Sequence, residues 1–100
     1  MQVSIVKSDQ NTSIKLQGRF DFNTHRDFRA AAESTLLEAA NQLQIDLAGV
    51  DYLDSSALGM LLMLRDKAHA VNKTVALVNC RGSVQQVLEI ANFGKLFAIS

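Results

Sequence analysis

A short acid and hydroxyl cluster near the middle of the chain carries the clearest chemical signal in the sequence. Asp54, Ser55 and Ser56 stand side by side, directly before a segment with the apolar spacing of a helix. Such side chains can cap the helix by accepting hydrogen bonds from its first backbone N–H groups. Alternatively, a hydroxyl at this end of a helix can carry a phosphate, which the positive end of the helix dipole stabilises. Because only one of the three residues can be the cap, the other two need a second explanation.

Residues at helical spacing from Ser56 indicate a docking surface on the same predicted helix. A glycine one turn into that helix costs about 1 kcal/mol relative to alanine and lets another surface approach closely. Part of the apolar surface around it is covered by neighbouring elements, and the remainder is typical of a partner-binding face. The stripe, called here the docking strip, comprises Ser56, Gly59, Met63 and Lys67, with Leu58, Leu62 and Arg65 on its flank.

Enzymatic chemistry fits the sequence poorly, and we expect the protein not to be an enzyme. A receiver-type phosphoacceptor at Asp54 would need further carboxylates at the end of the first strand to hold Mg²⁺. That position offers only Asp9, in a polar turn. A serine hydrolase needs a Gly-x-Ser-x-Gly turn and a positioned histidine, whereas His25 and His69 are expected to be solvated.

No metal, cofactor or nucleotide site is predicted. The single cysteine, Cys80, and two distant histidines form no ligand cluster. We expect Cys80 to be a small apolar residue at the end of a buried strand. Gly18, Gly49 and Gly82 are expected to be isolated turn glycines, because they lack the spacing of a phosphate-binding loop.

Alternating and continuous apolar runs predict four strands. Residues 3–5 and 14–16 alternate between apolar and polar around the polar stretch 8–13, which predicts a half-buried hairpin. Residues 42–47 also alternate, and the apolar run 74–78 is typical of a strand covered on both faces. The Asp54 cluster therefore follows the third strand, and functional sites in such sheets gather at the carboxyl ends of strands.

Helical periodicity fills the gaps between these strands. Thr24 is the predicted cap of a first helix, with Asp27 at its third position. The second helix is expected from Ser55 or Ser56 to about Val71. The predicted core residues of these two helices are Phe28, Ala32, Thr35, Leu36 and Ala39, and then Ala57, Met60, Leu61, Leu64, Ala68 and Val71.

A third helix is predicted from Ser83, whose spacing to Gln86 matches a capping box. Gly94 is predicted to end it in the left-handed conformation. Its expected inward residues are Val84, Val87, Leu88 and Ala91, and residues 95–100 are expected to add an edge strand. This order predicts an α/β fold with a mixed sheet of four to five strands, covered by three or more helices, in one domain over residues 1–100.

Composition limits the function classes further. The 100 residues are 48% hydrophobic, and ten Lys and Arg balance ten Asp and Glu. A zero net charge excludes the broad basic surface of a nucleic-acid binder. The longest nearly apolar run, residues 57–64, is too short to span a membrane, and no secretory signal opens the sequence. Together with the single cysteine, this predicts a cytoplasmic protein, monomeric or weakly self-associating.

The segment 51–59, Asp-Tyr-Leu-Asp-Ser-Ser-Ala-Leu-Gly, resembles the signature of the STAS domains of bacterial anti-sigma factor antagonists. Residues 16–21 and 87–93 resemble the second strand and the last helix of that family, so the resemblance covers nearly the whole chain. It implies that Ser56 is the phosphoacceptor, that Asp54 and Ser55 shape its loop, and that Asp21 lies near it. The sequence departs from the family at Ala57, where many members carry glycine, so the first turn of the helix is expected to be stiffer.

The resemblance implies function by partner switching. The unphosphorylated protein would bind an anti-sigma factor or serine-kinase-type partner, phosphorylation on Ser56 would switch it off, and a serine phosphatase would restore it. An alternative that the family leaves open is the STAS subunit of a lipid-transporting ABC complex, docking through the same helix without phosphorylation. The expected partner-binding residues are Asp21, Asp54, Ser55, Ser56, Leu58, Gly59, Leu62, Met63 and Lys67.

Overall fold

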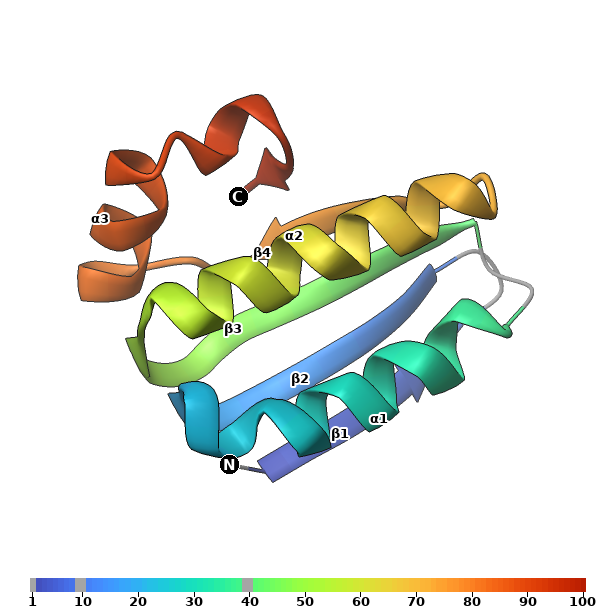
Figure 1. Ribbon diagram of the computed structural model, residues 1–100, viewed down its shortest axis with the longest axis horizontal. Helices are drawn as coiled ribbons and strands as arrows, with labels where there is room; N and C mark the ends of the chain where they lie inside the picture. Colours follow the sequence, from blue (N-terminus) through green and yellow to red (C-terminus); the bar gives the residue numbers. More distant parts are fainter. Residues whose placement is uncertain (1, 9–10, 39–40) are drawn as a thin grey trace.

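The computed structural model describes residues 2–8, 11–38 and 41–100 (Figure 1). Five strands form one sheet in the order β1-β2-β3-β4-β5, and three helices connect the last four strands. The elements are β1 (Gln2–Lys7), β2 (Asn11–Phe20), α1 (His25–Leu36), β3 (Gln42–Leu53), α2 (Ser55–Ala70), β4 (Thr74–Val78), α3 (Gly82–Ile90) and β5 (Ala98–Ile99). The predicted α/β fold with a mixed sheet is therefore confirmed.

Strand directions follow from the connections. β1 and β2 form an antiparallel hairpin, and every later neighbour pair is parallel, because a helix between two strands returns the chain to the same end of the sheet. Figure 1 shows α1 and α2 side by side across one face of the sheet, with both helices starting at the end where β2 and β3 finish. The carboxyl ends of β2 and β3 and the beginnings of α1 and α2 therefore meet in one place.

The core lies between the sheet and these helices. Ile14, Leu16, Leu43, Ile45 and Leu47 alternate with more exposed residues on the strands and are at most 1% exposed. On α1, Phe28, Ala32 and Thr35 are buried as predicted, and on α2 Ala57, Met60, Leu61, Leu64 and Ala68 are buried. Ala39 and Asp9, which the sequence placed in the first helix and in the polar turn, lie outside the described residues.

The structure corrects several predicted element ends. β3 continues to Leu53, six residues beyond its predicted end, because apolar Val50 and Leu53 are buried and keep the strand on the core. Val71 was predicted to be a core residue, but it follows the last turn of α2 and is 51% exposed. The residues directly before Asp54 therefore belong to β3, so the strand leads into α2 with only Asp54 between them.

The predicted helix caps are partly wrong. Thr24 precedes α1, but its hydroxyl makes no cap bond to α1 and instead closes the turn that begins at Asp21. α3 begins at Gly82, one residue before Ser83, so Ser83 is inside the helix and the capping box with Gln86 is absent. The left-handed residue after α3 is Asn92 at φ 60° and not Gly94, since asparagine also tolerates this conformation.

Two of the predicted turn glycines lie inside strands. Gly18 of β2 has φ 101°, a conformation that side chains disfavour. A Cβ at Gly49 of β3 would lie 2.7 Å from Cγ of Gln17. Between Lys15 and Arg19 the pairing of β2 with β3 shifts twice, and β3 holds one extra residue at each shift. These bulges bend the strand and bring Tyr52 opposite Arg19, next to the start of α2.

Candidate functional site

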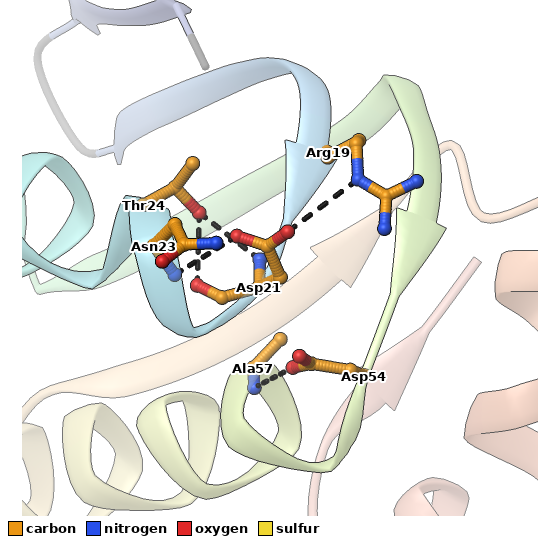
Figure 2. A network of polar contacts seen from close by, with 6 residues as sticks. All are labelled: Arg19, Asp21, Asn23, Thr24, Asp54 and Ala57. Carbon is orange, nitrogen blue, oxygen red and sulfur yellow. Dashed lines mark hydrogen bonds and ion pairs between the residues drawn. The ribbon is translucent and has the colours of Figure 1, made fainter.

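A tight turn at the end of β2 holds Asp21 in place (Figure 2). The Asp21 carboxylate accepts a hydrogen bond from the backbone N–H of Asn23 at 3.0 Å, and the Thr24 hydroxyl accepts one from the Asp21 N–H at 3.0 Å. Its other carboxylate oxygen lies 3.4 Å from Nε of Arg19. The structure thus gives Asp21 a local role in the turn Phe22–Thr24, next to the start of α1.

Arg19 links this turn to the end of β3. Its guanidinium lies 4.0 Å from the centre of the Tyr52 ring, while its Nε faces Asp21. A cation over an aromatic ring is stabilising even at an exposed site, by about 0.5–1 kcal/mol. Tyr52 is 40% exposed, so Arg19 and Tyr52 form a polar and aromatic edge beside the Asp54 cluster.

Asp54 is the cap of α2. Its backbone is extended, and its carboxylate accepts a hydrogen bond from the N–H of Ala57 at 2.9 Å (Figure 2). Its own N–H donates to the carbonyl of Phe20 at 3.4 Å, which ties the beginning of α2 to the end of β2. The choice among three cap candidates is thereby settled, and Ser55 and Ser56 are the first two residues of the helix.

The two serines differ in their surroundings. Ser55 is exposed, whereas Ser56 is half-buried and lines a surface cavity of about 170 Å³. No side-chain hydrogen bond of either serine occurs among the described residues, so neither hydroxyl caps the helix. Ala57, at which the sequence departs from the signature that it resembles, is fully buried, so its methyl group anchors the first turn of α2 to the core.

The cavity beside Ser56 lies between α1 and α2. Phe22 at its rim is 65% exposed, and the imidazole of His25 stacks on the Phe22 ring with centroids 5.2 Å apart. His25 is thus half-buried, in contrast to the predicted solvated residue, while His69 is exposed as predicted. The cavity is lined by Phe22, His25, Arg29, Ser56, Met60 and Met63.

The residues of the predicted docking strip and its flank lie on two sides of α2, one toward α1 and the other toward the C-terminal segment. Met63 and Lys67 line a groove against α1, and Met63 is also 38% exposed. Gly59 is exposed, and nothing lies within 4 Å of where its Cβ would be. Leu58 and Leu62 are half-buried and pack against the core. The two leucines therefore offer less open apolar surface than their helical positions suggested.

Arg65 marks the second flank of the helix. Its Nε donates to the carbonyl of Leu96 at 2.8 Å, so this side of α2 faces the C-terminal segment of the chain.

Phe22 and Arg29, which line the cavity beside Ser56, were not recognised as site residues in the sequence. His25 and Arg29 are one helical turn apart and so share one side of α1, but no spacing in the sequence shows that this side faces Ser56.

Cys80, just after β4, is half-buried. Burial, and to a lesser extent the charge of Asp46, raise the pKa of its thiol above the ordinary value.

Across residues 2–8, 11–38 and 41–100, no three acidic, histidine or cysteine side chains are grouped as a metal site would require. None of the helices in these ranges has the length and apolar character needed to cross a bilayer.

Comparison with known proteins places this geometry in a family. A curated relative, the STAS-domain containing protein PA14_20770 of Pseudomonas aeruginosa, is 48% identical over 91 residues, which cover 91% of this chain and 89% of the relative. An anti-sigma factor antagonist from Mycobacterium paratuberculosis has a similar structure, with a TM-score of 0.87 at 20% identity over 98% of this chain and 83% of that one.

The Bacillus cell fate determinant SpoIIAA is similar in two solved states. Its unphosphorylated form gives a TM-score of 0.82 at 19% identity, over 99% of this chain and 88% of that chain. Its phosphorylated form gives 0.74 at 18% identity, over 99% and 91%. The family model described as "Mlab, STAS domain" matches residues 3–98. The chain therefore belongs to the STAS domain family, as the resemblance of its sequence indicated.

Proposed function

We propose that this protein is a cytoplasmic anti-sigma factor antagonist that acts by partner switching and not by catalysis. In its unmodified form it binds an anti-sigma factor or serine-kinase-type partner through the docking strip and the loop residues Asp21, Asp54 and Ser55. Phosphorylation on Ser56 releases the partner, and a serine phosphatase restores binding. The likeness to an anti-sigma factor antagonist and to the phosphorylated form of SpoIIAA supports this role.

The observation that carries the proposal is the cap of α2. Asp54 supplies the hydrogen bond that a helix start requires, so the Ser56 hydroxyl is not needed for that purpose. Ser56 instead lines an open cavity beside Met63 of the docking strip. A phosphate there would add about 1.5 to 2 negative charges at the edge of the strip.

The physical consequence is a large loss of affinity. A partner that covers Met63 and the exposed edge at Gly59 would also have to cover the phosphate, and taking its charge out of water costs free energy even where cations lie beside it. A thousandfold weaker complex corresponds to about 4 kcal/mol. The fold need not change, because Ser56 is only half-buried and lies at the open end of a helix.

The direct experiment is a comparative capture of binding partners. Protein with phosphoserine encoded at position 56 is compared with unmodified protein and with a control that carries phosphoserine at Ser83, an exposed residue in the first turn of α3. We expect a kinase-type or anti-sigma partner, identified by mass spectrometry, to bind the unmodified and Ser83-modified proteins but not the Ser56-modified one. Equal capture by all three proteins would contradict switching.

The same experiment separates the alternative function. A STAS subunit of a lipid-transporting ABC complex would dock through α2 whether or not Ser56 is modified. Capture of a transporter ATPase in place of a kinase-type partner, undiminished by the phosphate at position 56, would favour that function over partner switching.

A further inference from the structure

The cavity beside Ser56 brings two nitrogen-bearing side chains to the predicted phosphorylation site. His25 and Arg29 of α1 line it together with Ser56 of α2, although about thirty positions separate the two helix starts in the sequence. The remaining lining is apolar, from Phe22, Met60 and Met63. The cavity, at about 170 Å³, has room for a phosphoryl group attached to the serine oxygen.

His25 is held in a fixed orientation. Its Nδ1 donates to the carbonyl of Phe22 at 2.6 Å, and its ring stacks on the Phe22 ring at an angle of 26°. Because Nδ1 carries the proton of that bond, Nε2 is the ring atom left for a further contact. In the imidazolium form Nε2 also donates, so it can bind a phosphate oxygen while Nδ1 keeps the bond to Phe22.

Arg29 is the second basic residue of the cavity. Its Nε faces the Glu33 carboxylate at 3.3 Å, one turn further along α1. In the part of the chain that the structure describes, no acceptor contacts its two Nη groups. Guanidinium groups bind phosphate oxygens with charge-assisted, often paired hydrogen bonds. The ion pair with Glu33 is exposed on both sides and is worth at most about 1 kcal/mol, so it is readily exchanged for a phosphate.

The carboxylates of the acidic residues near Ser56 already have hydrogen-bond or ion-pair partners of their own. The Asp54 carboxylate caps α2, and the Asp21 carboxylate bonds Asn23 and faces Arg19. Glu33 is the acidic residue that pairs with Arg29 on α1, and its side chain is 57% exposed. The charged side chains that line the cavity with Ser56 are therefore basic, His25 in its imidazolium form and Arg29.

We propose that His25 and Arg29 form a phosphate-binding pair that receives the phosphoryl group of phosphorylated Ser56. This inference rests on the proposed modification of Ser56. The phosphate lies in the cavity between α1 and α2, where it covers the apolar lining of Met60 and Met63. The modified state is then an ordered surface in which the cavity is filled, and not merely the unmodified surface with an added mobile charge.

The test uses protein with phosphoserine genetically encoded at position 56, so it requires neither the kinase nor the partner. The pH titration of the phosphate is followed by ³¹P NMR in the folded protein and in urea. Cations within reach favour the dianion, so the midpoint in the folded protein should lie about one pH unit below that in urea. In Arg29→Gln and in His25→Gln most of this difference should disappear, and Arg29→Lys should recover part of it.

Arg26→Gln is the matched control, because Arg26 is an exposed α1 residue next to His25 that does not line the cavity. It should leave the midpoint unchanged. Equal midpoints in folded and urea-unfolded wild type, or an unchanged difference in both Arg29→Gln and His25→Gln, would overturn the phosphate-binding pair. Neither result bears on whether a kinase modifies Ser56, so failure of this inference is distinguishable from failure of partner switching.

Discussion

The Asp54 carboxylate accepts the N–H of Ala57 at 2.9 Å and so caps α2 in place of either following serine. The three adjacent residues Asp54, Ser55 and Ser56 are equally good cap candidates in the sequence, but this hydrogen bond gives them different roles. Asp54 stabilises the helix, Ser55 is exposed at its first position, and Ser56 lines the cavity against α1. The proposed switch depends on this separation, because a hydroxyl needed for the cap could not be modified without loss of stability.

Replacement of the cap should be destabilising. Asp54→Ala removes the bond to Ala57 and should lower the free energy of unfolding by about 1 kcal/mol, measured by urea denaturation. Asp51→Ala is the matched control, since Asp51 is exposed at the end of β3; it should change the stability by less than about 0.5 kcal/mol. Equal stability of both variants would mean that a serine takes over the cap.

Substitutions at Ser56 should leave the fold intact. Ser56→Ala and Ser56→Asp are expected to change the free energy of unfolding by less than about 1 kcal/mol, because Ser56 is half-buried and makes no cap bond. Thermal unfolding followed by circular dichroism measures this. A Ser56→Ala variant that no longer folds would show that the hydroxyl is structural.

The exposed side of α2 should tolerate a charge that the buried side does not. Met63→Glu should fold like wild type and lose partner affinity, because an unpaired carboxylate is costly only when a partner covers it. Leu61→Glu should unfold the domain, since Leu61 is 0% exposed. Circular dichroism and a binding titration together separate the two effects.

Gly59→Leu is the companion variant without a charge. The space around Gly59 is open, so added bulk should leave the fold intact and block close approach of a partner. Wild-type affinity in both Met63→Glu and Gly59→Leu would move the interface elsewhere, most simply to the turn around Phe22, whose ring is 65% exposed.

Cys80 should make stability depend on alkaline pH. Burial and Asp46 raise the pKa of the thiol in the folded state, so the folded protein keeps the proton longer than the unfolded chain. The stabilisation is therefore present below the unfolded thiol pKa of about 8.5 and is lost as pH rises through the folded pKa. Cys80→Ala should show a smaller fall in the free energy of unfolding above pH 8.5, measured by urea denaturation at several pH values.

Regular burial patterns made most of the fold predictable. The alternation at Leu43, Ile45 and Leu47 and the helical spacing of Ala57, Leu61 and Leu64 each reflect one face on the core. Element ends were less predictable, because β3 runs on to Leu53 through two bulges that depend on its pairing with β2. The cap of α3 was also missed, since local spacing at Ser83 does not show where the chain enters the helix.

The site was only partly predictable for a related reason. Ser56, Gly59 and Met63 share one helix, so their relative positions follow from the sequence spacing alone. His25 and Arg29 belong to another helix, and their approach to Ser56 follows from the packing of α1 against α2. The packing of α1 against α2 cannot be predicted from any local pattern in the sequence.

The most direct test of the account is the position of the phosphate. The protein is purified from the cells that produce it, or incubated with its kinase, and intact mass and fragment spectra locate the modification. We predict one phosphate on Ser56, with none on Ser55, and no modification of the Ser56→Ala variant. A phosphate on Ser55 alone, or unmodified protein under conditions in which the partner is released, would contradict Ser56 as the switch.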